Sequence, residues 1–329
     1  MNVLSLFDGM SCGQIALTNL GCFPDKYYAS EVDKFAIQQT HHVFPDTIHI
    51  GDVTQVDVSK LDKIDLIIGG SPCQSFSFAG KQAGMATTEN IEITDLDQYL
   101  DLKIMGFEFT GQSYLFWEYM RILTEVRKYN PDVKFLLENV VMSKKWEAVL
   151  TNAIGVEPVK INSNLVSAQN RKRLYWTNIA EIAQPEDEGI FLRDILEDNV
   201  DEKYYLSQKA IEGITNRLRV NAAKRNGFGA CVVSPDGKAN TLLVSPQSME
   251  HNLIAVGRQG TVTDGKSIGI MEALRNGNAL RRLTPVERAR LQTVPSWYEW
   301  VVSDTQIYRM CGNGWTVRVI EHILKNLFV

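Results

Sequence analysis

Hydrophobic and polar positions alternate in two different ways along this chain. Up to about residue 185, short apolar runs alternate with stretches whose apolar residues recur at helical spacing. This rhythm is typical of an α/β fold, a doubly wound and mostly parallel sheet with helices on both faces. It predicts strands at 2–6, 27–32, 64–69, 133–138, 157–161 and 173–177, and helices at 13–20, 33–43, 113–129 and 142–154.

The stretch from Gly80 to Gly111 interrupts this alternation of strand and helix patterns. It is rich in Gly, Thr, Asp and Asn and follows a Pro-Cys dipeptide. We expect a long loop with a short helix, and long loops in compact domains are more often functional than not.

After about residue 185 the alternation stops. PEDEG is typical of a linker, and 190–275 places turn signals between short β-prone runs such as ACVVS and TLLVS. The pattern predicts a smaller, mainly β domain at 190–280 and a hinge segment at 281–304. The first domain, 1–185, is expected to be completed by a helical C-terminal segment, 305–329, that packs back on it.

Composition places the chain among ordinary globular proteins. Of its 329 residues 44% are hydrophobic and 22% charged, and no apolar stretch reaches 18 residues. The start, MNVLSLFDGMSCG, has no basic region before its apolar run, so we expect a cytoplasmic protein without a membrane span. The cysteines form no C-x-x-C pair and have no His at zinc-ligand spacing, so we expect neither a metal site nor disulfides. They are Cys12, Cys22, Cys73, Cys231 and Cys311.

The net charge of −5 argues mildly against a nucleic-acid partner, because phosphate contacts need positive charge. The runs 217–225 (RLRVNAAKR) and 281–290 (RRLTPVERAR) are nevertheless basic, and one basic face can coexist with an acidic whole. The alternative for either run is a solvated helix surface.

The ends of the first three expected strands are suited to a nucleotide-type ligand. Gly9 and Gly13 let the backbone after the first strand approach a ligand. Glu31 ends the second strand and Asp52 the third, and ligands of open α/β sheets bind at this edge. Glu31 is suited to ribose hydroxyls and Asp52 to an adenine amino group. A solvated loop acid or a helix cap is the alternative for each.

A reactive centre is predicted at Cys73. The sequence IDLIIGGSPCQSFSFAG holds this thiol in a turn directly after a buried strand. A thiol in such a setting is a candidate nucleophile, although most buried cysteines are core fillers. Glu138 ends another apolar strand, where a partly apolar cleft suits a general acid.

The stretch QNRKRLYWTN adds Gln169, Arg171 and Arg173 on one face of an extended segment. Arginines there can hold a carboxylate, a phosphate or an anionic adduct, and a basic surface strand is the alternative. Together these residues predict a nucleophile, an acid and a cation around an adenosyl cofactor.

In order along most of the chain, the sequence resembles the cytosine-C5 DNA methyltransferase family. The stretches that carry the resemblance are LFDGMSCG, ASEVD, GDV, SPCQSFSFAG, ENV, QNRKR, RRLTPVERARLQ and GNGWTVRVI. Each is weak alone, but as an ordered set they are specific. FDG, ASEVD and the Trp315 after GNG resemble the animal de novo DNA methyltransferases, whereas the compact length suits a bacterial or phage enzyme. The chain departs from the family at Ser11-Cys12, which replaces a Gly-Gly pair, and in the long insertion after Cys73.

The resemblance implies a Rossmann-like methyltransferase fold, S-adenosyl-L-methionine as cofactor and double-stranded DNA as partner. It implies that Cys73 adds to carbon 6 of a flipped cytosine, with Glu138 at N3 and Arg173, supported by Arg171, at the nucleotide. The expected cofactor contacts are Phe7, Asp8, Gly9, Met10, Cys12, Glu31, Val32, Asp52, Val53, Pro72, Leu115, Asn313, Gly314 and Trp315. The expected DNA contacts are Ser75, Gln169, Arg217, Arg219, Lys224 and Arg225, with 190–280 as the target-recognition domain.

Two other functions stay open on sequence grounds. One is a transfer-RNA cytosine-C5 methyltransferase of the same fold, and the other is a catalytically silent DNA-binding relative. The length of 190–280 favours DNA, and the presence of Cys73, Glu138, Gln169 and Arg173 favours activity. The sequence determines neither the recognition site, nor a restriction partner, nor the oligomeric state.

Overall fold

The computed structural model of this chain describes residues 1–76, 84–223, 229–244, 251–257 and 267–328. The chain divides into two compact units. The first comprises 1–161, 172–184 and 320–329, and the second comprises 162–171 and 185–319. Residues 305–319, which were expected to complete the first domain, group with the second unit.

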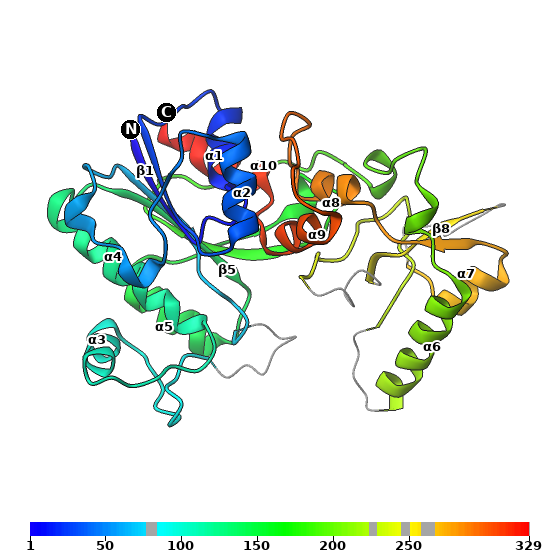
Figure 1. The fold of residues 1–329 in the computed structure, drawn as a ribbon, viewed down its shortest axis with the longest axis horizontal. Helices are drawn as coiled ribbons and strands as arrows, with labels where there is room; N and C mark the ends of the chain where they lie inside the picture. The colour runs from blue at the N-terminus through cyan, green and yellow to red at the C-terminus, as the bar shows by residue number, and fades with distance from the viewer. Residues whose placement is uncertain (77–83, 224–228, 245–250, 258–266, 329) are drawn as a thin grey trace. The chain divides into compact units, whose positions relative to one another are not determined.

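A mostly parallel sheet forms the centre of the first unit (Figure 1). Its seven strands run in the order β3-β2-β1-β4-β5-β7-β6. Neighbours from β3 through β5 are parallel, and β7 runs antiparallel to β5. The strands are β1 (Asn2–Leu6), β2 (Lys26–Ser30), β3 (Ile48–His49), β4 (Leu66–Gly70), β5 (Lys134–Val140), β6 (Val159–Asn162) and β7 (Lys172–Thr177). The predicted doubly wound sheet is confirmed.

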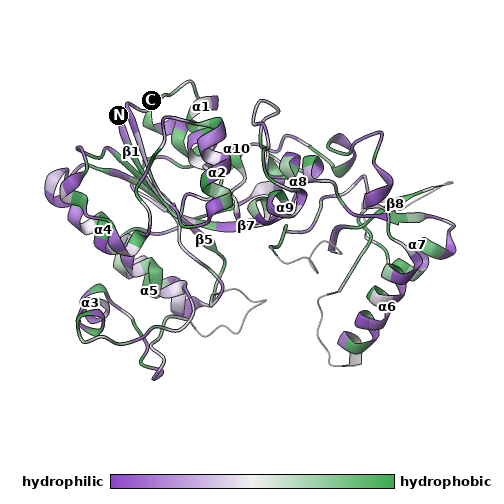
Figure 2. Cartoon of the chain, viewed as in Figure 1, coloured by the Kyte–Doolittle hydropathy of each residue, from purple (hydrophilic) through white to green (hydrophobic). Residues whose placement is uncertain are grey.

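Helices cover both faces of this sheet, as Figure 1 shows for α1 and α2 against α4 and α5. Their bounds are α1 (Cys12–Asn19), α2 (Lys34–Val43), α4 (Phe116–Tyr129) and α5 (Lys144–Ile154). Hydrophobic and hydrophilic residues alternate along α4 in Figure 2, as expected for a helix with one face on a core.

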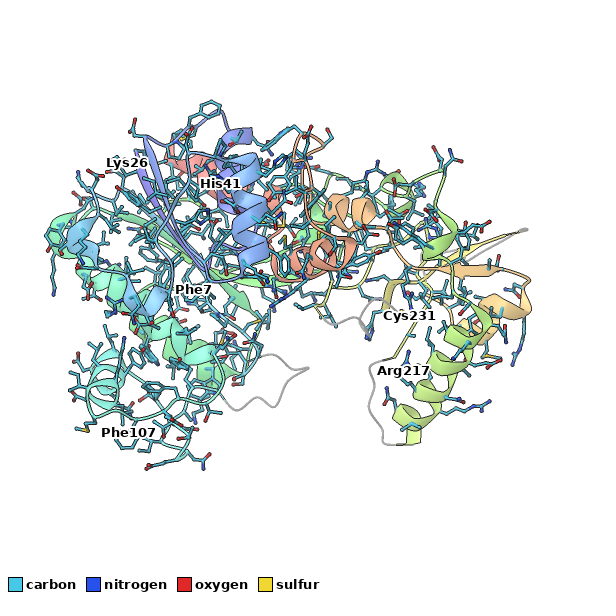
Figure 3. The ribbon with its side chains drawn as sticks, viewed as in Figure 1. Phe7, Lys26, His41, Phe107, Arg217 and Cys231 are labelled. Atoms are coloured by element: carbon cyan, nitrogen blue, oxygen red, sulfur yellow. The ribbon has the colours of Figure 1, made fainter. Side chains whose placement is uncertain are left out.

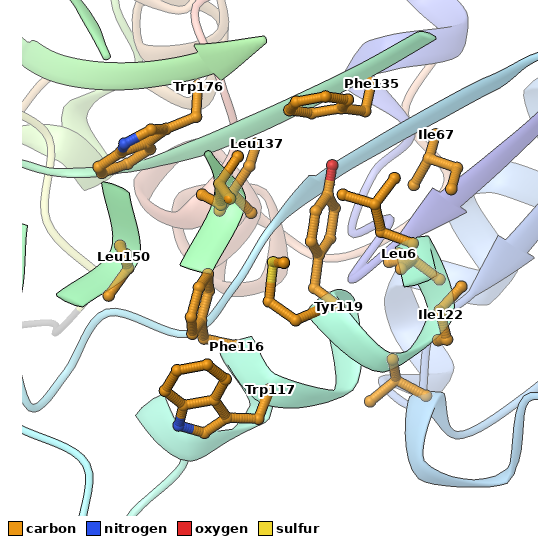
Figure 4. Packing of buried hydrophobic residues seen from close by; sticks show 14 of the residues in the cluster. Leu6, Ile67, Phe116, Trp117, Tyr119, Ile122, Phe135, Leu137, Leu150 and Trp176 are labelled. Atoms are coloured by element: carbon orange, nitrogen blue, oxygen red, sulfur yellow. The ribbon is translucent and has the colours of Figure 1, made fainter. Parts of the chain in front are cut away.

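The two faces are visible at adjacent residues of β4, because side chains of a strand point alternately to opposite sides. Ile67 belongs to the core that α4 and α5 cover, drawn in Figure 4 with Phe116, Tyr119 and Trp176. Ile68 faces α1 instead, where a Cβ at Gly13 would lie only 2.1 Å from its Cδ1. Gly13 therefore lets α1 pack close to the sheet.

The segment expected as a long loop with a short helix contains α3 (Leu96–Ile104). Tyr99 is 1% exposed and packs in the same apolar core as α4, so this insertion is attached to the first unit by buried contacts. The part at 77–83 lies outside the described residues.

The second unit has its own small apolar core, which α6 (Gln208–Ala223) and α7 (Ile270–Arg275) share with a short ladder of β8 (Ile254–Val256) and β9 (Ala279–Arg281). The expected mainly β character is not seen in its described residues. Among the described residues, the run ACVVS contributes only isolated bridges from Val232, and 241–244 of the run TLLVS form no strand. The remaining helices are α8 (Pro285–Leu291), α9 (Asp304–Asn313) and α10 (Val317–Leu324). Within the described ranges, no helix is long and apolar enough to cross a membrane.

Candidate functional site

The order of the sheet places two loops next to each other. β1 pairs with β2 on one side and with β4 on the other, so the chain winds outward in both directions from the β1–β4 pair. In open α/β sheets the carboxyl edge at such a switch point is where ligands bind. The loop at 7–11 follows β1, and the loop with Cys73 follows β4.

The backbone after β1 is bent into an uncommon conformation. Phe7, Gly9 and Ser11 all have positive φ, at 59°, 58° and 62°. Only glycine adopts this region without cost, and strained backbone of this kind concentrates at functional sites. Figure 3 labels Phe7 in this loop, and Ser11 then precedes the first turn of α1.

The carboxyl group of Asp8 holds this loop from the inside. Its Oδ1 accepts hydrogen bonds from the hydroxyls of Ser5 at 2.5 Å, Tyr27 at 2.9 Å and Ser11 at 3.2 Å. Burial raises the pKa of Asp8 from 3.8 to about 6. Its Oδ2 is buried with no hydrogen-bond partner among the described residues, so an acceptor remains available beside the loop.

Glu31 closes the loop from the end of β2. Its Oε2 accepts from the N–H of Gly9 at 2.8 Å, and its Oε1 accepts from the N–H groups of Val32 and Asp33 at 2.8 Å. A carboxylate has about four acceptor sites, so it can still receive ligand hydroxyls. Val32 beside it is 70% exposed, an apolar side chain open to a ligand at this edge.

Asp52 follows β3 and caps the short turn η1 (Val53–Gln55) by accepting from the N–H of Thr54 at 2.9 Å. It is therefore both a helix cap and an exposed acid at the predicted edge. Val53 is buried, as are Met10 and Cys12, whereas Pro72 and Leu115 are half-buried. Buried members of this set can meet a ligand through their backbone.

Cys73 lies in a turn whose flanking residues, on both sides, form hydrogen bonds with other side chains. Asn139 donates from Nδ2 to the Oγ of Ser71 at 3.0 Å and to its carbonyl oxygen at 3.2 Å. On the other side the N–H of Ser75 donates to the Oγ of Ser113 at 3.1 Å. Asn139 was not predicted from the sequence, and its position directly after Glu138 is the signal that would have found it. All five cysteines lie in described ranges, and none is in a disulfide.

Glu138 and Arg173 form an ion pair on neighbouring strands. Glu138 lies opposite Gly70 in the β4–β5 register, three residues before Cys73. The Nε of Arg173 lies 2.8 Å from its Oε1, and the two side chains are only 12% and 11% exposed. The structure thus places the predicted acid and the predicted cation together, at the strand ends from which the Cys73 turn departs.

Arg171 and Gln169 are interior residues of the second unit. The guanidinium of Arg171 donates to the carbonyl oxygens of Leu242, Gly312 and Gly314 at 2.9–3.2 Å. Gln169 is 0% exposed, and its amide bonds to Leu291, Gln292 and the N–H of Leu242. Both side chains bind backbone groups inside the second unit. The buried position of Gln169 therefore does not favour the surface contact with DNA that was expected for it.

The remaining predicted residues also lie in the second unit or outside the described ranges. Asn313 is exposed, and Gly314 and Trp315 are half-buried. Arg217, labelled in Figure 3, and Arg219 are exposed on α6. Lys224 and Arg225 lie outside the described residues.

Comparison with known proteins relates this chain to one family of methyltransferases. The sequence pattern of the family described as C-5 cytosine-specific DNA methylase matches residues 1–101 and 161–329. The type II methyltransferase M.HpaII of Haemophilus parainfluenzae is 30% identical, over 98% of this chain and 88% of its own. The type II methyltransferase M.NlaX of Neisseria lactamica is 29% identical, over 99% of this chain and 95% of its own.

Solved structures share the fold. The Entamoeba histolytica methyltransferase EhMeth superposes with a TM-score of 0.72 at 14% identity, covering 100% of this chain and 98% of that one. The S. pombe Dnmt2 methyltransferase superposes with a TM-score of 0.68 at 19% identity, covering 100% of both chains.

Proposed function

This chain belongs to the family of C-5 cytosine-specific DNA methylases, and on that premise we propose that it methylates carbon 5 of cytosine in double-stranded DNA with Cys73 as nucleophile. The observation that carries the assignment of the site is the placement of the Cys73 turn and the Glu138–Arg173 pair at one edge of the sheet.

The residues after β1 and β2 fit S-adenosyl-L-methionine, which supplies the methyl group when bound. Glu31 would accept hydrogen bonds from the two ribose hydroxyls, and the exposed side chain of Val32 would pack on the adenine. Asp52 would accept a hydrogen bond from the adenine amino group. The buried, unpartnered Oδ2 of Asp8 suits a cationic ligand, because burial without a partner is costly for an acceptor.

Cys73 performs the covalent step. A cytosine within a duplex is out of reach of side chains, so it is flipped into the site at a cost of a few kcal/mol. The Cys73 thiolate would form a bond to carbon 6 as the double bond between carbons 5 and 6 opens, which makes carbon 5 nucleophilic. Carbon 5 would then take the methyl group as the bond between that group and the sulfonium sulfur breaks. Loss of the proton from carbon 5 then restores the ring double bond and breaks the bond between sulfur and carbon 6, which returns the thiolate.

Glu138 and Arg173 act on the flipped base. Glu138 lies at the N3 edge of cytosine, and a proton shared between its second carboxyl oxygen and N3 draws electrons from carbon 6. Arg173, 2.8 Å from that carboxyl group, orients it and offers its remaining donors to the nucleotide. Within the second unit, Arg171 holds the backbone around Asn313 through the carbonyl groups of Gly312 and Gly314.

The second unit supplies target recognition. Its exposed Arg217 and Arg219 follow the phosphate backbone, together with Lys224 and Arg225, and residues within 190–280 read base edges. The named relatives are type II methyltransferases, which supports a cognate restriction enzyme as partner and a location in the cytoplasm of a bacterial or phage-infected cell.

A trapping experiment tests this function. The full chain is incubated with labelled S-adenosyl-L-methionine and a library of duplexes, transfer RNA or no nucleic acid. We expect label in duplex DNA, and duplexes with 5-fluorocytosine at the target should form a denaturant-resistant complex because fluorine does not leave as the proton does. Label in transfer RNA alone would support the RNA methyltransferase, and no label in either would support the silent relative.

A further inference from the structure

Arg121, in the middle of α4, reaches across to the turn that carries Asp52. Its Nη2 donates to the carbonyl oxygen of Val53 at 3.2 Å, and its Nη1 donates to that of Val56 at 3.2 Å. One planar guanidinium thus holds two carbonyl groups of the turn that follows β3. A lysine ammonium is a single point charge and does not reproduce this fork.

The guanidinium is itself held by two carboxylates of the same helix. Its Nε donates to Glu118 at 2.7 Å, and its Nη1 lies 3.0 Å from both oxygens of Glu125. Glu118 is 0% exposed, so its charge must be paired inside the protein. With the carboxylates on one side and the carbonyls on the other, Arg121 has little rotational freedom.

Glu118 also receives two donors from the insertion after Cys73. The hydroxyl of Tyr99 donates to its Oε1 at 2.6 Å, and the Nζ of Lys103 lies 2.5 Å from the same oxygen. Both belong to α3, the helix in the long stretch that follows Cys73. A continuous series of hydrogen bonds and ion pairs therefore joins α3, Glu118, Arg121 and the turn that follows Asp52.

We propose that Arg121 is a positioning residue for cofactor binding, which orients the Asp52–Val53 turn toward the adenine and is held in place by Glu118 and the insertion helix α3. This inference rests on the proposed function, since Asp52 reads the adenine there. Asp52 is the N-cap of η1, the Val53 carbonyl lies in its first residue and Val56 is its C-cap, so Arg121 holds both ends of the turn on which Asp52 lies. Loss of Arg121 removes two hydrogen bonds to that turn and leaves the apolar packing of Val53 and Val56 against α4 in place.

Arg127 provides the matched control on the same helix. Its guanidinium lies over the ring of Phe135, 5.3 Å from the centroid, and makes no hydrogen bond to the Asp52 turn within the described residues. Arg121→Met and Arg127→Met remove the same charge from the same helix, but only the first removes a contact with the turn.

The test measures cofactor affinity by calorimetric titration of the full chain with S-adenosyl-L-methionine, with steady-state rates alongside. We expect Arg121→Met to raise the Kd roughly tenfold, the loss of one or two hydrogen bonds to a charged group, with Arg127→Met within about twofold of wild type. The KM for cofactor should rise in parallel, whereas kcat at saturating cofactor and the KM for duplex stay within about twofold. Tyr99→Phe, which removes one donor to Glu118, should raise the Kd about threefold.

Several outcomes overturn the proposal. An Arg121→Met protein with wild-type Kd does so, and so does an equal rise in Arg121→Met and Arg127→Met, which would reflect the stability of α4 alone. If Arg121→Met does not fold, Arg121→Lys carries the test, because it keeps the charge beside Glu118 but loses the fork. A wild-type Kd for Arg121→Lys then overturns the proposal. If the wild type and all variants fail to bind S-adenosyl-L-methionine, the proposed function fails first and the inference with it.

Discussion

At the scale of single residues, Cys73 carries the most specific prediction. Serine has nearly the size of cysteine, but its hydroxyl is far less nucleophilic than a thiolate. Cys73→Ser should therefore lose methyl transfer by at least about a thousandfold while it still binds duplex DNA, as measured by label transfer and by gel shift. Activity above a trace in this variant would remove Cys73 from the mechanism.

Asp8 predicts a pH dependence of stability. Because burial raises its pKa in the folded protein from 3.8 to about 6, the folded state binds this proton more tightly than the unfolded chain. The contribution of Asp8 to the free energy of unfolding is therefore largest below pH 4 and is lost as the pH rises through 6. This loss is at most about 3 kcal/mol, at about 1.4 kcal/mol per unit of pKa difference between the folded and unfolded states.

The measurement compares the free energy of unfolding of wild type and Asp8→Asn from pH 4 to pH 8. We expect the wild type to lose stability relative to the variant across this range, since asparagine does not titrate. Parallel curves for the two proteins would show that Asp8 is ionised in both states.

At the scale of elements, α5 supports the segment that follows Cys73. Trp146 contacts Phe76, with ring centroids 5.9 Å apart, and it also packs directly on Gly84. The N–H of Gly84 donates to the carbonyl oxygen of Ser75 at 3.0 Å, which brings the two ends of this segment together. Helix α5 therefore helps to determine where the Cys73 turn lies.

A glycine substitution tests this support. At Gly84, φ is +70° and a new Cβ would lie 1.8 Å from a ring carbon of Trp146, whereas at Gly106, φ is +79° with nothing within 4 Å. Gly84→Ala should lower the free energy of unfolding by roughly 2–4 kcal/mol and should lower kcat, because backbone strain and overpacking add at this position. Gly106→Ala should lower the free energy of unfolding by about 1 kcal/mol and leave kcat unchanged, because only backbone strain acts there. Thermal unfolding and label transfer measure both. Equal losses in the two variants would mean that only the backbone angle matters.

At the scale of the whole molecule, recognition and chemistry are expected to lie in different segments. Exchange of 190–280 for the corresponding segment of a relative with another target should move the methylated sequence with the segment, because the proposed catalytic residues Cys73, Glu138 and Arg173 all lie in the first unit. Bisulfite sequencing of methylated host DNA reads the outcome. A folded, active chimaera that keeps the original target would place recognition elsewhere, and the insertion after Cys73 would be tested next.

The sequence by itself determined the sheet of the first unit and the edge at which we propose the site. Strands such as β1 and β5 were predictable because apolar periodicity and turn residues act over a few neighbours. Cys73, Glu31 and Glu138 follow or end such strands, so their common edge follows from a parallel sheet. In the described residues of the second unit the expected β-prone runs form only a short ladder and isolated bridges, because such runs need a partner strand that no local pattern supplies.

Only the tertiary structure decided which polar residues lie at the edge of the proposed site and which hold the protein together. Gln169 and Arg171 share a motif with Arg173, yet Arg173 pairs with Glu138 while the other two bind backbone carbonyls of distant segments. Asp8 and Arg121 likewise act through partners far away in sequence, such as Tyr27 and Val53. A buried polar group is stable only where its partners are, and those positions are set by the packing of the whole unit.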